Sequence, residues 1–303
     1  MTIGVALAVS GAENYVDDIV ELSRKAAAAG IGSVWLGQRL DYDAGALAAI
    51  IGRDVPGLHV GTSAIPIPGR HPVLLSSLAQ TAQAATHGHF HLGLALGAPH
   101  LIEQIFGLKY ERPIALLREF LTALRPLLET GQADFSGELL TARTALPAAV
   151  PGAQPPVPVL VAAMGPQALR VTGELADGTL PYLASPRTLE EHIVPTITAA
   201  AERAGRPAPR IVAFVAGGYA SDVDAAREKA LETMAFYDPI PSYQRVIKLG
   251  GASRAGELAV LGDEKTITDE VRRYFDAGAT EVVFTQLELG EPQRTFEVLG
   301  SLS

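Results

Sequence analysis

The sequence of 303 residues contains no cysteine. This absence excludes disulfide bonds, thiolate nucleophiles and cysteine-ligated metal centres. Aromatic residues make up only 6% of the chain and charged residues only 19%. Because hydrophobic residues reach 48%, the low charge indicates a folded chain with a large core and argues against disorder.

Charge and hydropathy also exclude classes of partner. The formal net charge is −9, and the sequence has no basic stripe of the kind that binds nucleic acids. Its longest apolar runs are far shorter than a membrane span, and no basic residues precede the first of them as in a signal peptide. We therefore expect a cytoplasmic protein that acts on a small molecule, without a nucleic-acid or membrane partner.

Short apolar runs alternate with amphipathic helical patterns along the whole chain. Eight runs are predicted to be strands, at residues 2–9, 33–36, 58–65, 90–96, 159–163, 177–180, 211–220 and 281–286. Helical patterns follow them, the first over residues 15–29 and another over 72–85. This alternation predicts an α/β fold, specifically a (β/α)8 TIM barrel, and an open doubly wound sheet is the alternative.

Two segments interrupt the alternation and are predicted to be insertions in a single domain that spans residues 1–303. Residues 131–158 combine a Ser136–Gly137 turn between short apolar segments, which suggests a β-hairpin, with a proline-rich linker. Residues 238–262 are rich in glycine, proline and serine. We expect this second segment to be irregular and to cover a site as a lid, and a plain surface loop is the alternative.

The transition near Gly165 is the most informative local feature. An apolar strand over residues 159–163 breaks at Gly165, and Pro166 suits the first position of a helix. A helix start leaves N–H groups without partners and carries partial positive charge, so it suits an anion such as phosphate. An ordinary strand-to-helix turn is the alternative interpretation of the same residues.

Polar residues that directly follow strands are candidates for chemistry, because ligands of a barrel bind at the carboxyl ends of its strands. Gln38 and Arg39 follow the second strand, and Arg39 could stabilise a developing oxyanion or bind a carboxylate. His100 follows the fourth strand and suits proton transfer at neutral pH. Tyr182 follows the sixth strand and could donate a hydrogen bond. Each also fits a structural role, in a solvated loop, a helix entry or a pocket wall.

Three histidines, His87, His89 and His91, alternate at the spacing of a strand, which is a pattern that can bind a metal ion. They precede or open the fourth strand, however, so they lie at the end of the barrel opposite to the ligand-binding end. No carboxylate that would orient metal-bound histidines lies nearby in the sequence. We therefore expect no metal site.

Several segments together resemble the bacterial-luciferase-like superfamily, and more closely its branch of oxidoreductases that use the deazaflavin coenzyme F420. The matching stretches are residues 28–36, 61–63, 93–97, 161–166, 168–178 and 262–264. They follow the order of the family over nearly the whole chain. The stretch after the fifth strand, with its downstream Gly-Glu-Leu-Ala-Asp-Gly, is the most specific of them.

This resemblance implies a barrel with a flavin-like ring lying across its C-terminal mouth. Ser63 and Ala64 match a pair that forms a non-proline cis peptide behind the ring, and residues 163–166 match the backbone that holds the cofactor phosphate. Gln38 matches a position that contacts the ring. The cofactor-binding residues that the resemblance implies are Gly37, Gln38, Ser63, Ala64, Ala95, Leu96, Ala163, Met164, Gly165 and Pro166.

Two departures from the family pattern bear on the reaction. The sugar and alcohol dehydrogenases of this branch carry Asp-His after the second strand and a glutamate after the fourth, where this chain has Gln38–Arg39 and Ala98. A reductase that uses reduced F420 is therefore at least as good an interpretation as a dehydrogenase. Its candidate catalytic residues are Gln38, Arg39, His100 and Tyr182.

Three other functions stay open at this point. One is an FMN-dependent monooxygenase of the same superfamily, and another is a barrel that binds a cofactor or ligand without turnover. The third, which the resemblance implies, is a methylene-pterin reductase, because relatives with that role share the branch. Relatives often form homodimers through their early helices, so a homodimer is open as well.

Overall fold

The computed structural model describes residues 1–303, apart from the side chain of Leu101. Eight parallel strands close a barrel in chain order, and the last pairs with the first, Thr2 lying opposite Glu281. The barrel strands are β1 (Thr2–Ala6), β2 (Ser33–Leu36), β3 (His59–Thr62), β5 (Phe90–Ala95), β8 (Val159–Val161), β9 (Gly178–Thr179), β10 (Arg210–Tyr219) and β12 (Glu281–Thr285). The predicted (β/α)8 barrel is confirmed, and the closure excludes an open sheet.

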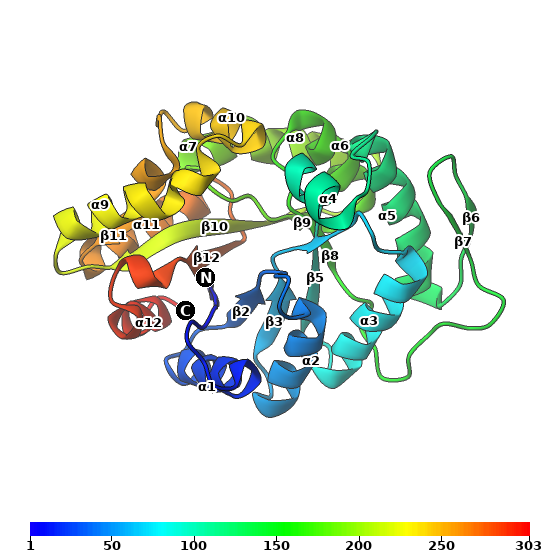
Figure 1. Cartoon of the computed structure of the whole chain (residues 1–303), viewed down its shortest axis with the longest axis horizontal. Helices are drawn as coiled ribbons and strands as arrows, with labels where there is room; N and C mark the ends of the chain where they lie inside the picture. The colour runs from blue at the N-terminus through cyan, green and yellow to red at the C-terminus, as the bar shows by residue number, and fades with distance from the viewer.

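Helices cover the outside of the barrel (Figure 1). The main ones are α1 (Tyr15–Ala28), α2 (Ala44–Asp54), α3 (Pro72–Ala85), α5 (Pro113–Thr130), α6 (Pro166–Leu175), α8 (Val194–Arg203), α9 (Val223–Thr233), α11 (Glu264–Asp276) and α12 (Pro292–Gly300). Sequence sets their ends locally: the Asn14 side chain caps α1, and Pro72 begins α3. Among the described residues, no helix is both long and apolar enough to cross a membrane.

Shorter elements complete the chain. They are β4 (Ile65–Pro66), α4 (Pro99–Phe106), α7 (Pro186–Thr188), the π-helical turn η1 (Leu189–Ile193), and the 3-10 turns η2 (Met234–Tyr237) and η4 (Leu287–Leu289). Strand β4 pairs with the end of β5 in parallel, so it lies beside the C-terminal mouth of the barrel.

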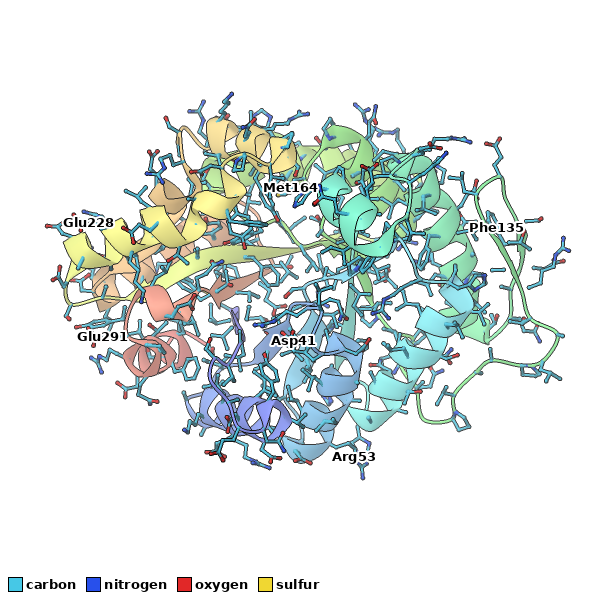
Figure 2. The ribbon with its side chains drawn as sticks, viewed as in Figure 1. Asp41, Arg53, Phe135, Met164, Glu228 and Glu291 are labelled. Atoms are coloured by element: carbon cyan, nitrogen blue, oxygen red, sulfur yellow. The ribbon has the colours of Figure 1, made fainter. Side chains whose placement is uncertain are left out.

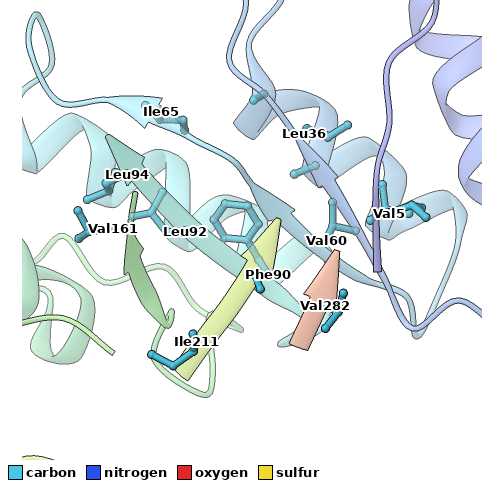
Figure 3. Packing of buried hydrophobic residues seen from close by; sticks show 14 of the residues in the cluster. Val5, Leu36, Val60, Ile65, Phe90, Leu92, Leu94, Val161, Ile211 and Val282 are labelled. Carbon is cyan, nitrogen blue, oxygen red and sulfur yellow. The ribbon is translucent and has the colours of Figure 1, made fainter. Parts of the chain in front are cut away.

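The core has an outer and an inner part. In the outer part, buried side chains of neighbouring strands, among them Leu36, Val60 and Leu94, pack together and against the helices (Figure 3). The inner part fills the barrel and includes Trp35, which is fully buried. Gly61 makes room for the indole, because a Cβ atom at Gly61 would lie 2.3 Å from a ring carbon of Trp35.

The predicted hairpin is present between α5 and β8. Strands β6 (Asp134–Ser136) and β7 (Thr141–Arg143) pair antiparallel and project from one side of the barrel (Figure 1). The carboxylate of Glu119 on α5 accepts hydrogen bonds from the turn of the hairpin, including one of 2.9 Å from the Leu139 amide. Figure 2 shows Phe135 of β6 at the edge of the molecule, whereas Asp41 and Met164 lie toward its middle.

The expectation that residues 238–262 are irregular is wrong. This segment forms α10 (Pro241–Leu249), the 3-10 turn η3 (Ala255–Leu258) and β11 (Val260–Gly262), which extends the sheet by pairing with β10. Pro241 occupies the first turn of α10, a position that suits proline, so it begins a helix in a segment whose composition suggested irregular structure. Val246 and Ile247 then bury the inner face of that helix.

Candidate active site

A cavity of about 700 Å³ opens at the C-terminal mouth of the barrel. Residues at or just after the ends of seven of the eight barrel strands contribute to its lining, and β10 contributes Phe214 from its middle. Its volume falls in the range of about 300–1,000 Å³ that is typical of small-molecule sites. The cavity therefore lies where a barrel of this type binds ligands.

One side of the cavity, which we call the floor, is made of small residues. They follow or end five consecutive strands and are Ala6, Gly37, Ser63, Ala64, Ala95 and Ala162. A Cβ atom added to Gly37 would meet only the Ser63 carbonyl oxygen, at 3.8 Å. The Ser63–Ala64 peptide bond is cis, as the resemblance implied. Small side chains and open backbone give a planar ring room to lie on the strand ends.

Another part of the lining, which we call the tyrosine wall, consists of Tyr182, Tyr237 and Tyr243. Their rings meet edge to face, with centroids 5.2 Å apart for Tyr182 and Tyr237 and 5.1 Å for Tyr237 and Tyr243. Tyr182 follows β9, Tyr237 ends η2 and Tyr243 lies on α10, so the wall joins the barrel to the 238–262 segment. The Tyr182 hydroxyl donates a 2.7 Å hydrogen bond to Oε1 of Gln286.

Burial changes the acidity of this wall. It raises the pKa of Tyr182 well above the ordinary value, although the hydrogen bond to Gln286 partly opposes the shift. Burial likewise raises the pKa values of Tyr237 and Tyr243. Phenols are protonated at neutral pH even at their ordinary pKa, and these shifts keep the three tyrosines protonated into more alkaline solution, so their hydroxyls can donate hydrogen bonds.

The start of α6 lies in the turn that follows Ala162, a residue of the floor. Gly165 is its N-cap, and no described side chain caps the first turn. The backbone amides of Gln167 and Ala168 donate to no acceptor among the described residues. A Cβ atom added to Gly165 would meet no atom within 4 Å, so open space lies beside these amides. This arrangement fits a phosphate group. Residues 163–166 themselves do not line the cavity.

The two candidates after β2 are held by their own loop. The Gln38 amide nitrogen donates to the carbonyl oxygens of Arg39 and Tyr42, at 2.7 and 2.6 Å, and its oxygen accepts from the Ala44 amide. Gln38 lines a neighbouring groove and not the cavity. Arg39 does line the cavity, but its guanidinium pairs with both oxygens of Asp41, at 3.0 and 2.9 Å, which raises the pKa of Arg39.

Some of the remaining predicted site residues line the cavity and others lie outside it. Tyr182, Gly37, Ser63, Ala64 and Ala95 all line the cavity. His100 is exposed on the first turn of α4, and neither His100 nor Leu96 is on the cavity lining. The structure therefore brings Arg39 and Tyr182 to one cavity and leaves Gln38 and His100 outside it.

Gln286 is a lining residue that the sequence analysis did not select. It directly follows β12, so the rule of examining residues after each strand could have found it. It has φ +50°, an uncommon backbone conformation for a residue other than glycine. Tyr42, in the loop after β2, lines the cavity too and was likewise missed.

The other end of the barrel interior holds a closed polar network. Arg210 donates to Nδ1 of His91 at 3.1 Å and to Glu281 at 2.9 Å, and His91 Nε2 lies 3.0 Å from His59 Nδ1. Since arginine only donates, His91 accepts at Nδ1 and carries its proton on Nε2. Desolvation by burial lowers the pKa of His91 well below its usual value and lowers that of His59.

The histidine pattern of the sequence is only partly reproduced in space. His89 packs edge-on against His59, whereas His87 is exposed outside the cluster. Within the part of the chain that the structure describes, no group of three potential ligands is arranged to hold a metal ion. Glu281, distant in sequence, is the carboxylate of this network and accepts a 3.0 Å hydrogen bond from the Trp35 indole.

Comparison with known proteins agrees with this geometry. Residues 1–295 match the family model of luciferase-like monooxygenases. An uncharacterised protein of Mycobacterium tuberculosis is 30% identical over 227 residues, which cover 68% of this chain and 67% of that protein. The F420-dependent glucose-6-phosphate dehydrogenase of Rhodococcus erythropolis is 28% identical over 269 residues, covering 81% and 77%.

A solved structure extends the likeness to the whole fold. An F420-dependent secondary alcohol dehydrogenase, in complex with an F420–acetone adduct, superimposes with a TM-score of 0.83 over 100% of this chain and 98% of that one, at 17% identity. The match over nearly the full length and the barrel with its mouth cavity lead to one conclusion: the chain is an enzyme that belongs to the luciferase-like monooxygenase family.

Proposed function

We propose that this enzyme transfers a hydride between coenzyme F420 and a small organic substrate, and that it works as a reductase with the reduced coenzyme. The observation that carries the proposal is the floor of small residues beside the uncapped start of α6. Together they offer space for a planar ring and amides for a phosphate. The F420-dependent dehydrogenases similar to this chain support the choice of coenzyme.

The chain's own residues would divide the work as follows. Ser63, Ala64 and Ala95 hold the ring face against the strand ends, and the amides at the start of α6 bind the phosphate. When bound, the coenzyme supplies the hydride. Tyr182 supplies a proton to the reduced substrate, because it is the cavity phenol with a defined hydrogen-bond partner. Residues 238–262 cover the cavity as a lid through Tyr243 and exclude water.

The choice of a reductase over a dehydrogenase rests on the proton donors and proton acceptors that the cavity offers. A dehydrogenase needs a base to take a proton from an alcohol, but Gln38–Arg39 and Ala98 stand where the family's dehydrogenases carry histidine and carboxylates. The phenols of the tyrosine wall are protonated at neutral pH, so they suit donation. Donation is the task of a reductase.

Titration of the purified protein with F420 and with FMN tests the cofactor. We expect F420 to bind and FMN to bind at least tenfold more weakly, and a Gly165→Val variant to lose affinity because its side chain enters the space beside the α6 amides. Ala46→Val, at an exposed position of α2 away from the cavity, is the control. Tight FMN binding without F420 binding would instead establish the FMN-dependent monooxygenase that the family description suggests.

Turnover is tested separately. Steady oxidation of reduced F420 by any member of a panel of enones, imines and quinones would exclude a barrel that only binds its ligand. Binding of F420 with no oxidation by any of them would contradict the reductase.

A further inference from the structure

The cavity holds few groups that can carry charge. Among its described lining residues these are Arg39, Glu288 and four tyrosines. Arg39 is already paired with Asp41, and half of its side chain is exposed, at 51%. Glu288 is exposed as well. The cavity therefore offers no unpaired cation to a phosphate or carboxylate, whose burial without a partner is costly.

One polar focus lies within this lining, at Tyr182 and Gln286. The Tyr182 hydroxyl donates to Gln286 Oε1 at 2.7 Å, and hydrogen bonds from Tyr182 and Gln286 partly offset the rise that burial causes in the pKa of Tyr237, so Tyr237 shares this focus. The amide nitrogen of Gln286 carries two N–H groups, so one remains for a ligand when the other is used, and the Tyr182 phenol proton can rotate to a new acceptor. The pair can thus donate to an oxygen atom placed between them.

The surfaces around this focus are apolar and aromatic. Leu180, Phe214, Leu287 and Phe296 line the cavity beside the rings of Tyr237 and Tyr243. Phe214 also packs edge to face against Trp35 in the barrel interior, with centroids 5.6 Å apart, and this contact holds the Phe214 ring in place. Such faces favour a flat or cyclic hydrocarbon skeleton over a polyhydroxylated one.

We infer that the substrate of this enzyme is a neutral cyclic or aromatic carbonyl compound whose oxygen binds between Tyr182 and Gln286. The inference rests on the proposed hydride transfer from reduced F420. The hydride forms a new C–H bond at the carbonyl carbon, and the π electrons of the C=O bond move to the oxygen. The oxygen takes the proton of the Tyr182 hydroxyl, and the phenolate regains a proton from water.

Binding of a matched pair of probes to the coenzyme-free chain tests this chemistry. Acetophenone and benzoate have the same ring and nearly the same size but differ in charge. Saturation-transfer NMR should give acetophenone at least tenfold tighter binding than benzoate. Tyr182→Phe should reduce this preference severalfold. Tyr274→Phe is the matched control, because it removes another buried phenol, on α11 and outside the cavity.

A charge substitution gives the opposite readout. Gln286→Lys would place a cation at the polar focus, and we expect it to make benzoate the tighter ligand. Equal affinities of the wild type for both probes, binding of neither, or a preference unchanged in Tyr182→Phe would overturn the inference. Failure of F420 to bind while the acetophenone preference persists would overturn the proposed function and leave the chemistry of the pocket standing.

Discussion

The two ends of the barrel interior use polar residues in opposite ways. At the N-terminal end, Arg210, Glu281 and His91 satisfy one another, and Glu281 is only 3% exposed. At the C-terminal end, Tyr182 and Gln286 face an open cavity with donor groups to spare. Polar groups at the first end hold the strands together, whereas those at the second are available to a ligand. Burial alone therefore does not mark a functional residue, and unused hydrogen-bonding capacity beside open space is the better sign.

The largest effect is expected from a substitution that breaks the polar network at the N-terminal end of the barrel. Glu281→Ala removes the partner of Arg210 and the acceptor of Ser33 and Trp35, so it should lower the free energy of unfolding by about 3–5 kcal/mol. Urea denaturation followed by circular dichroism measures this loss. Glu264→Ala, which removes an exposed partner of Arg294, should cost less than about 1 kcal/mol. Equal losses in the two variants would contradict the role given to the network.

The second effect concerns the C-terminal end and leaves stability nearly unchanged. Tyr182→Phe should lower the rate of substrate reduction about 100-fold, because it removes the proton donor while keeping the ring of the tyrosine wall. Stopped-flow measurement of F420 oxidation gives this rate, and F420 affinity should match that of the wild type. A rate within a factor of about three of the wild type would remove Tyr182 from the mechanism.

A third, smaller effect is expected from a substitution that fills the floor of the cavity. Ala95→Leu adds bulk where the ring is proposed to lie, so F420 should bind at least about tenfold more weakly, equivalent to about 1.4 kcal/mol. Fluorescence titration measures the dissociation constant. Ala46→Leu, the same change at an exposed position of α2, serves as the control. Unchanged affinity in Ala95→Leu would place the ring elsewhere.

The smallest expected effect is a pH dependence confined to the N-terminal network. His91 is faced by Arg210, His59 and Trp35, with His89 and Glu281 next in the cluster, and its pKa is lowered on folding. The unfolded chain therefore binds more protons as the pH falls below about 6.5, and stability decreases by at most about 1.4 kcal/mol per pH unit from this group.

Comparison of variants isolates the contribution of His91. The difference in the free energy of unfolding between the wild type and His91→Asn should become smaller as the pH falls from about 7.5 to about 5.5, by at most about 1.4 kcal/mol for each pH unit below about 6.5. His87→Asn, at the exposed histidine, should follow the wild type throughout. Parallel profiles for the wild type and His91→Asn would show that His91 is not held neutral by the fold.

Local signals explain what the sequence predicted well. Strand β2 and helix α3 have the bounds expected from the sequence, 33–36 and 72–85, because glycine, proline and apolar spacing mark both their ends. The barrel followed from the repeated alternation. The segment 238–262 was misread, because its composition was given more weight than the position of Pro241 at a helix start.

The site was harder to predict because its contacts join distant parts of the chain. Tyr182 and Gln286 are 104 residues apart, and no local pattern shows that they meet. Gln38 suits a ring contact by position, but the carbonyl of Tyr42 and the guanidinium of Arg70 hold its side chain in the loop. The histidine network likewise depends on Arg210 and Glu281, which only closure of the barrel brings to His91.

The chain's single tryptophan lies between these two ends. Trp35 stacks on His91 at 5.8 Å and meets Phe214, a residue of the cavity lining, edge to face. Its indole is fully buried and donates to the Glu281 carboxylate. Its intrinsic emission therefore arises from one known site inside the barrel, so loss of the polar network on one side and ligand entry on the other can be recorded in the same spectrum without any label.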